Sequence, residues 1–464
     1  MAHFDVLVIG AGTAGLTVAR LVSRAGKQVA LVERDRPGGD CLWTGCVPTK
    51  TLVEVARVLH EATHSSQMGI TVPDAYLDWD AVRRHVTNAQ EVAGRPDTEA
   101  TIASWGTTFL RGSARFTSPH AVDVDGERHT ASAFVIATGG EPAVPPIPGL
   151  EDAGFNTNVE AVAWESLPDS LAIIGGGAIG IEFAQMTARL GVRTTVIEAE
   201  ERLLPSEDAE ASAVIEHILA EEGVEVHTGV SVERVERQGL QRVVHAAGRT
   251  VTAERILVAT GRRPVVQGLG LEAARLRMHR GRPVLDNRLR TSQPHIYAAG
   301  DVADGPQFTH VAEAQGRLVA NVLLGKRFQS WSGDIVPHVT FSDPEVASVG
   351  LTEAQAKRRY GAKATTWRVE LDEVDRAVTM GRTDGFLKVT TAPGWNRFVP
   401  GLRGLMGDTI VGATIVAPNA GELLMPIVVA MRARLPQGII AWNIQAYPTM
   451  SLGLRQVLGA RFDN

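Results

Sequence analysis

Two cysteines give this sequence its clearest chemistry. Cys41 and Cys46 are the only cysteines among 464 residues, and four residues separate them. In a reducing compartment such a close pair is more often catalytic or metal-binding than a structural disulfide. A metal site needs two further ligands at suitable spacing, and no nearby Cys or His supplies them. The pair therefore predicts thiol–disulfide exchange without a bound metal.

Two segments of the chain predict the same order of strand, glycine turn and helix. Apolar runs at 6–9 and 171–174 lead into glycine turns and then into expected helices at 16–25 and 181–190. The turns contain Gly10, Gly12 and Gly15 in the first half, and Gly175, Gly177 and Gly180 in the second. The first glycine permits a tight turn, the second lets the backbone approach a pyrophosphate, and the third allows close helix packing. We expect two dinucleotide sites with phosphates at helix N-termini.

An acid follows each glycine turn. Glu33 and Glu198 each end an expected strand, 18 residues beyond the third glycine of their turn. At this spacing a carboxylate accepts hydrogen bonds from ribose hydroxyls, although an ordinary solvated acid is the alternative. Because a carboxylate repels a 2′-phosphate, Glu198 favours NADH over NADPH. Arg193 and Arg202 lie near enough in sequence to hold a phosphate, so NADPH stays possible.

The remaining pattern predicts an α/β fold of two Rossmann-like dinucleotide-binding domains and an α+β C-terminal dimerisation domain. Each half has a strand that runs into Ala-Thr-Gly, which places Thr138 and Gly139 in the first half and Gly261 in the second. A proline-rich connection follows the first of these strands. We expect an FAD-binding domain at 1–150 and 271–335, an NAD(P)H-binding domain at 151–270, and an interface domain at 336–464.

Composition excludes several classes of partner. The net charge of -6 is spread without a basic stripe, so we expect no nucleic acid partner. No apolar run reaches about 18 residues, and the start MAHFDVLVIGAG has neither a basic region nor a cleavage site. We therefore expect a cytoplasmic protein without a membrane partner.

The segment at 38–50 reads Gly-Gly-Asp-Cys-Leu-Trp-Thr-Gly-Cys-Val-Pro-Thr-Lys. It resembles the pyridine nucleotide-disulfide oxidoreductases, which include dihydrolipoamide dehydrogenase, glutathione reductase and mercuric reductase, and the resemblance extends over essentially the whole chain. It implies a flavoprotein enzyme that uses FAD and NADH, with NADPH as the alternative, and carries a redox-active Cys41–Cys46 disulfide.

The resemblance also implies roles for single residues. Cys46 corresponds to the thiol nearer the flavin and Cys41 to the interchange thiol that faces the acceptor. Lys50 corresponds to the lysine beside the flavin ring, and Glu182 to its ion-pair partner. Asp301 corresponds to the acid that holds a ribityl hydroxyl.

Two further segments match the family. Residues 309–316 resemble the helix that starts at the pyrimidine end of the flavin; His310 is either part of that site or an ordinary residue of the helix start. Residues 341–350 and 417–423 resemble the interface domain, which implies a homodimer.

The chain departs from the thiol-handling members near its C-terminus. Those members carry a His-Pro motif with a Glu five residues after the His, whereas this chain has Tyr447 and Leu452 at these positions. A tyrosine with a pKa of about 10 is a poor base, and a leucine cannot orient one. Loss of this dyad is reminiscent of mercuric reductase. The cysteine pair that mercuric reductases carry at the C-terminus, and their extra N-terminal metal-binding domain, are missing from this sequence.

The electron acceptor is left open by these departures. Trp43 stands where better-known members have a small polar residue, either for packing or as one wall of a flat acceptor site. The favoured hypothesis is reduction of a small acceptor: a soft metal ion such as mercuric ion, a quinone or an unusual disulfide. The alternatives are a dihydrolipoyl dehydrogenase and a redox sensor without turnover.

Overall fold

The first sheet combines parallel and antiparallel strands. The computed structural model describes residues 2–73, 75–326, 328–394 and 406–462. The sheet has the order β3-β2-β1-β6-β5-β4, with β18 also paired to β6. Its strands are β1 (His3–Ile9), β2 (Val29–Glu33), β3 (Thr107–Arg111), β4 (Ala114–Ser118), β5 (Ala121–Val124), β6 (Glu127–Ile136) and β18 (Ile296–Ala298). Strands β1, β2, β3, β6 and β18 form the parallel pairs.

The helices that accompany this sheet are α1 (Thr13–Ser23), α2 (Gly39–Trp43), α3 (Cys46–His64), α4 (Trp79–Gly94), α5 (Glu99–Ser104) and α10 (Thr309–Leu323). Helix α1 begins before the start expected from the sequence, at Thr13 instead of Leu16. The reason is that Gly15 lies inside the first helical turn, where it packs on the strand that precedes it. Short 3₁₀ helices lie at Ser65–Met68, Arg95–Asp97, Gly361–Lys363 and Leu371–Glu373.

A second parallel sheet repeats the arrangement on a smaller scale. Its order is β10-β9-β8-β14, and its strands are β8 (Ser170–Ile174), β9 (Arg193–Ile197), β10 (Glu225–His227) and β14 (Arg255–Val258). The associated helices are α6 (Leu150–Ala153), α7 (Asn158–Ala161), α8 (Ala178–Arg189) and α9 (Ala209–Glu221). An antiparallel sheet follows, with β11 (Val232–Gln238), β12 (Gln241–Ala246) and β13 (Arg249–Ala253). Two ladders of two strands join β7 (Gly140–Pro142) to β15 (Arg262–Pro264) and β16 (Met278–His279) to β17 (Arg282–Pro283).

The C-terminal part is built on an antiparallel sheet of order β19-β20-β23-β22-β21. The strands are β19 (His338–Thr340), β20 (Glu345–Gly350), β21 (Thr365–Glu370), β22 (Phe386–Ala392) and β23 (Thr409–Ala417). The helices are α11 (Glu353–Tyr360), α12 (Asp375–Met380), α14 (Ala420–Ala433), α15 (Gly438–Ala441) and α16 (Leu452–Gly459). The expected α/β class with an α+β C-terminal part is confirmed. The domain boundaries stay a prediction, and of the expected third domain residues 395–405 and 463–464 lie outside the described part.

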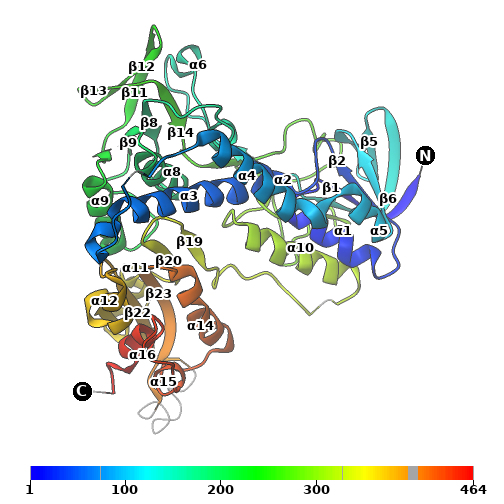
Figure 1. Cartoon of the computed structure of the whole chain (residues 1–464). Helices are drawn as coiled ribbons and strands as arrows, with labels where there is room; N and C mark the ends of the chain where they lie inside the picture. The colour runs from blue at the N-terminus through cyan, green and yellow to red at the C-terminus, as the bar shows by residue number, and fades with distance from the viewer. Residues whose placement is uncertain (1, 74, 327, 395–405, 463–464) are drawn as a thin grey trace.

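Helix α3 connects the three parts of the molecule. In Figure 1 this helix lies between the second sheet, which is above it, and the C-terminal domain, which is below it. Its buried Leu52 and Ala56 belong to one apolar cluster with Phe183 of α8 and Phe386 of β22. The middle of α3 thereby packs against α8, the helix that follows the second glycine turn. Among the described residues, no helix has the length and apolar character needed to cross a membrane.

Candidate active site

The two cysteines lie at the junction of α2 and α3. Cys41 is in α2, Cys46 opens α3, and both are free thiols, with Cys46 the more exposed. Thr309, the first residue of α10, donates a hydrogen bond from Oγ1 to Cys41 Sγ at 3.0 Å and lies 3.6 Å from Cys46 Sγ. Thr309 was expected at a helix start, but its contact with the thiols was not, because only the fold brings residues 41 and 309 together.

The thiols differ in acidity. The pKa of Cys46 is lowered to about 6, chiefly by a hydrogen bond from Cys41 and also by Thr309 and Lys50, while burial and Asp40 oppose the shift. The same hydrogen bond and burial raise the pKa of Cys41. The pair therefore shares one proton at neutral pH, with the thiolate on Cys46, at the N-terminus of a helix that also favours negative charge.

Lys50 and Glu182 meet across two parts of the molecule. Lys50 Nζ lies 2.7 Å from Glu182 Oε2, and the Glu182 side chain is only 3% exposed. The other carboxylate oxygen of Glu182 accepts a hydrogen bond from the backbone N–H of Phe341 at 3.0 Å, and the Lys50 ammonium lies over the Phe341 ring. A cation is thus held one helical turn from the Cys46 thiolate.

The glycine turns form open cradles. Gly10 and Gly175 have φ values of +103° and +114°, which disfavour any residue with a side chain. A Cβ atom on Gly15 or Gly180 would lie 1.9 Å from the carbonyl oxygen of Gly10 or Gly175. By contrast, a Cβ on Gly177 would meet open space, which leaves room for a phosphate at the start of the helix.

The same cradle is present in the first half. A Cβ on Gly12 would meet only Gly39 Cα, at 3.9 Å. The residues present therefore fit the pyrophosphates of two dinucleotides, the first at α1 and the second at α8.

Glu33 and Glu198 occupy equivalent places. Glu33 accepts hydrogen bonds from the backbone N–H groups of Ala11 (2.7 Å) and Asp35 (2.9 Å). Glu198 accepts from Gly176 and from Glu200, the latter at 2.8 Å. Each acid thus also fixes its glycine turn, a role that the sequence analysis did not predict. The proposed ribose contacts stay a prediction.

A largely buried arginine pairs with one of the expected cofactor residues, Asp301. Arg262 follows Gly261, and its Nε lies 3.2 Å from Asp301 Oδ2. Burial raises the pKa of the Asp301 carboxyl, and the charge of Arg262 opposes that effect. Thr138 Oγ1 donates a hydrogen bond to the carbonyl of Val265 at 2.6 Å, and Gly139 has a φ of +73°. Arg262 was not predicted from the sequence, because it carries no motif of its own beyond its place after Ala-Thr-Gly.

Two residues that were expected in the site, His310 and Tyr447, have their contacts elsewhere. His310 points away from the thiols: its Nε2 lies 2.8 Å from the carbonyl oxygen of Pro337, and its ring stacks on Phe308. Tyr447 is 72% exposed, and a hydrogen bond with Asp375 raises its pKa. Within one chain, then, neither side chain is placed at the dithiol, and their roles stay predictions.

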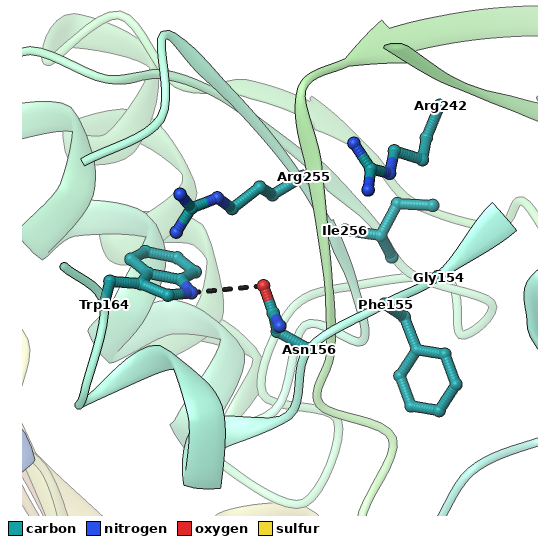
Figure 2. Close-up of a pocket in the computed structure, with 7 residues that line it drawn as sticks. All are labelled: Gly154, Phe155, Asn156, Trp164, Arg242, Arg255 and Ile256. Carbon is teal, nitrogen blue, oxygen red and sulfur yellow. Dashed lines mark hydrogen bonds between the residues drawn. The ribbon is translucent and has the colours of Figure 1, made fainter. Parts of the chain in front are cut away.

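A separate pocket lies on the second domain. Figure 2 shows it between Arg242, Arg255 and Trp164, with the Trp164 indole N–H donating to Asn156 Oδ1 at 3.1 Å. Arg255 begins β14, at the end of the strand opposite to Ala259 and the glycine turn. This pocket therefore lies away from the residues described above. In the described ranges, no three His, Cys, Asp or Glu side chains converge as a metal site would require.

Two dinucleotide cradles on Rossmann-like sheets, joined by a dithiol and a buried Lys–Glu pair, define a flavin- and nicotinamide-dependent oxidoreductase. The chain belongs to the pyridine nucleotide-disulphide oxidoreductase family, whose model matches residues 4–316, while the dimerisation domain of the same family matches 336–457. It is an FAD-dependent enzyme that uses NAD(P)H, and the dimerisation domain supports a homodimer.

Relatives cover almost the whole chain. It is 34% identical to a mercuric reductase of Bacillus cereus over 97% of this chain and 70% of that one. It is equally identical, at 34%, to a dihydrolipoyl dehydrogenase of Thermus scotoductus over 99% and 98%. Among solved structures, the Cu(II) complex of the HOCl-induced flavoprotein disulfide reductase RclA from Escherichia coli has a TM-score of 0.86 at 30% identity, covering 98% and 99%. These relatives are named for different substrates.

Proposed function

We propose that this enzyme transfers two electrons from NADH, through FAD and the Cys41–Cys46 pair, to a thiophilic metal ion such as mercuric ion, acting in the cytoplasm as a homodimer. The observation that carries the proposal is an accessible dithiol with one thiolate, in a chain that has Tyr447 and Leu452 where thiol-handling relatives have an acid–base dyad. A soft metal ion binds thiolates and needs no proton from the enzyme. The overall change is NADH and Hg²⁺ giving NAD⁺, H⁺ and Hg⁰.

Each residue would contribute through its own chemistry. The chemistry that FAD supplies when it is bound is to accept a hydride and to pass an electron pair to the disulfide. Lys50 places positive charge next to the Cys46 thiolate, and Glu182 offsets the cost of holding that cation half-buried. Cys41, hydrogen-bonded by Thr309, would meet the acceptor.

The place of Trp43 favours a metal ion over a quinone. Its indole N–H donates to the carbonyl of Pro37 at 2.7 Å, and the guanidinium of Arg36 lies 3.6 Å from the ring centroid. Its backbone carbonyl accepts from Gln90 at 2.7 Å. One face of the ring is already covered, which suits a packing role more than a stacking wall.

The surroundings of Glu198 support NADH. Arg202 donates to the carbonyl oxygens of Pro205 and Glu207, so its guanidinium is already engaged. Arg193 begins β9 while Glu198 follows its end, a separation of roughly 16 Å along an extended strand. Neither arginine is thus placed to neutralise a 2′-phosphate at Glu198.

Anaerobic reoxidation tests the acceptor. NADH-reduced enzyme is mixed separately with thiol-bound mercuric ion, a quinone and lipoamide, and the loss of reduced enzyme is followed by absorbance. We expect fast reoxidation by the mercuric complex, its loss in Cys41→Ser and Cys46→Ser, and slow reoxidation by lipoamide. Fast turnover with lipoamide would replace the proposal by a dihydrolipoyl dehydrogenase, and fast turnover with quinone alone would replace the metal ion. Reduction without reoxidation by any of the three would indicate a redox sensor.

The nicotinamide preference has its own test. Steady-state kcat/KM for NADH and NADPH is compared between wild type and Glu198→Gln, which removes the charge and keeps an oxygen for one of the two backbone hydrogen bonds. We expect wild type to prefer NADH and the variant to lose most of that preference. Equal use of both nucleotides by wild type would overturn the assignment.

A further inference from the structure

Arg262 joins two carboxylates from distant segments of the chain, Asp40 in α2 and Asp301 after β18. It opens β15, which pairs with β7, and it forms ion pairs with Asp301 and with Asp40. Its Nη2 also donates to the carbonyl of Gly140 at 2.7 Å. The Arg262 side chain is 14% exposed, compared with 48% for Asp40. A guanidinium buried to this degree is held in a single geometry by its partners.

Asp40 stands directly before the interchange thiol. Both residues lie in α2, whose backbone is closed by a hydrogen bond from the Thr44 N–H to the Asp40 carbonyl at 2.8 Å. Asp40 is therefore held next to Cys41 on the same short helix. An unpaired carboxylate at this place would repel a thiolate, because like charges at short range disfavour ionisation.

The charges facing the dithiol are few. Lys50 favours the Cys46 thiolate, whereas Asp40 opposes it, and Thr309 contributes a neutral hydroxyl. Asp40 also raises the pKa of Cys41. Arg262 is the cation that contacts Asp40, and it shares its charge with Asp301.

We propose that Arg262 is a positioning residue for the dithiol: it holds and neutralises the carboxylate of Asp40, so that Cys46 keeps a reactive thiolate at neutral pH. Arg262 acts through Asp40 and touches neither sulfur. This role is independent of which acceptor the enzyme reduces. The competing explanation is a purely structural clip between β15 and α2.

A double-variant cycle on the FAD-loaded enzyme separates the two explanations. Wild type, Arg262→Met, Asp40→Asn and the double variant are reduced anaerobically with NADH and treated with iodoacetamide between pH 5 and 9. Peptide mass spectrometry then measures the alkylation rate of Cys46 separately from that of Cys41. Flavin content and thermal melting show whether each variant is folded.

We expect Arg262→Met to slow Cys46 alkylation at pH 6 by about tenfold, because Asp40 is left unpaired. Asp40→Asn should speed it, and the double variant should return to the wild-type rate or exceed it. Arg262→Lys, which keeps a cation, should stay within about threefold of wild type. Equal rates in Arg262→Met and the double variant would overturn the proposal, as would an unchanged pH profile in Arg262→Met. If Arg262→Met does not fold, Asp40→Asn decides alone: an unchanged rate at pH 6 overturns the proposal.

Discussion

Lys50 Nζ lies 2.7 Å from Glu182 Oε2 and joins the helix that follows the cysteines to the helix that follows the second glycine turn. The two residues are far apart in sequence, yet they close the junction between the flavin and nicotinamide parts. Because Glu182 is 3% exposed, its charge depends on this one ammonium and on the backbone N–H of Phe341.

Removing the ammonium should destabilise the protein. We expect Lys50→Met to lower the free energy of unfolding by about 2 kcal/mol, since a buried carboxylate is left unpaired while Lys50 itself is a third exposed. The double variant Lys50→Met/Glu182→Gln should recover part of that loss because no buried charge remains. Urea denaturation with saturating FAD measures both, and a double variant that is less stable than the single one would contradict the explanation.

The hydroxyl of Thr309 should increase the acidity of Cys46. Thr309 lowers the pKa of Cys46, so Thr309→Val should raise that pKa above its value of about 6 and reduce the thiolate fraction at pH 6. We expect Cys46 alkylation at pH 6 to slow by about threefold, with little change at pH 9, where the thiolate predominates in both proteins. Thr309→Ser keeps the hydroxyl and is the matched control. A profile for Thr309→Val that overlays the wild type would show that the contact has no electrostatic effect.

Substitutions in the two glycine turns should distinguish the FAD site from the nicotinamide nucleotide site. A methyl group on Gly177 meets open space in the protein, so Gly177→Ala should fold and retain FAD but lose reduction by NADH. Gly12→Ala should fold and lose FAD, because the methyl group fills the first cradle. By contrast, Gly15→Ala puts Cβ against the Gly10 carbonyl and should destabilise the fold by at least about 2 kcal/mol. Flavin absorbance, NADH titration and thermal melting distinguish these outcomes. NADH reduction that survives in Gly177→Ala would place the nicotinamide nucleotide elsewhere.

Restoring the dyad should restore thiol chemistry. Tyr447→His with Leu452→Glu introduces a base and the acid that orients it. We expect kcat/KM for dihydrolipoamide to rise by at least about tenfold, with the maximum near the pKa of the histidine. Tyr447→Phe, which adds no base, should show no rise. If kcat/KM does not rise in the double variant, the missing dyad is not what limits turnover of thiol substrates.

Local features of the sequence determined much of the fold and the proposed chemistry. The strands of both Rossmann-like halves were predicted to within a few residues, because apolar runs that end in glycine turns have few alternative structures. The closeness of Cys41 and Cys46 along the chain was also enough to predict a redox pair. The helix starts were predicted about three residues late, because the third glycine lies inside the first helical turn.

Contacts between distant segments were decided only by the tertiary structure. Thr309 contacts Cys41 across 268 residues of sequence, and Arg262 contacts Asp40 across 222. The resemblance to a family pointed to Lys50 and Glu182, but neither spacing nor composition gave the 2.7 Å contact between them. Hydrogen bonds and ion pairs depend on distances of a few ångströms. Such distances are set by how sheets and helices pack, and a pattern of residue types along the chain does not encode them position by position.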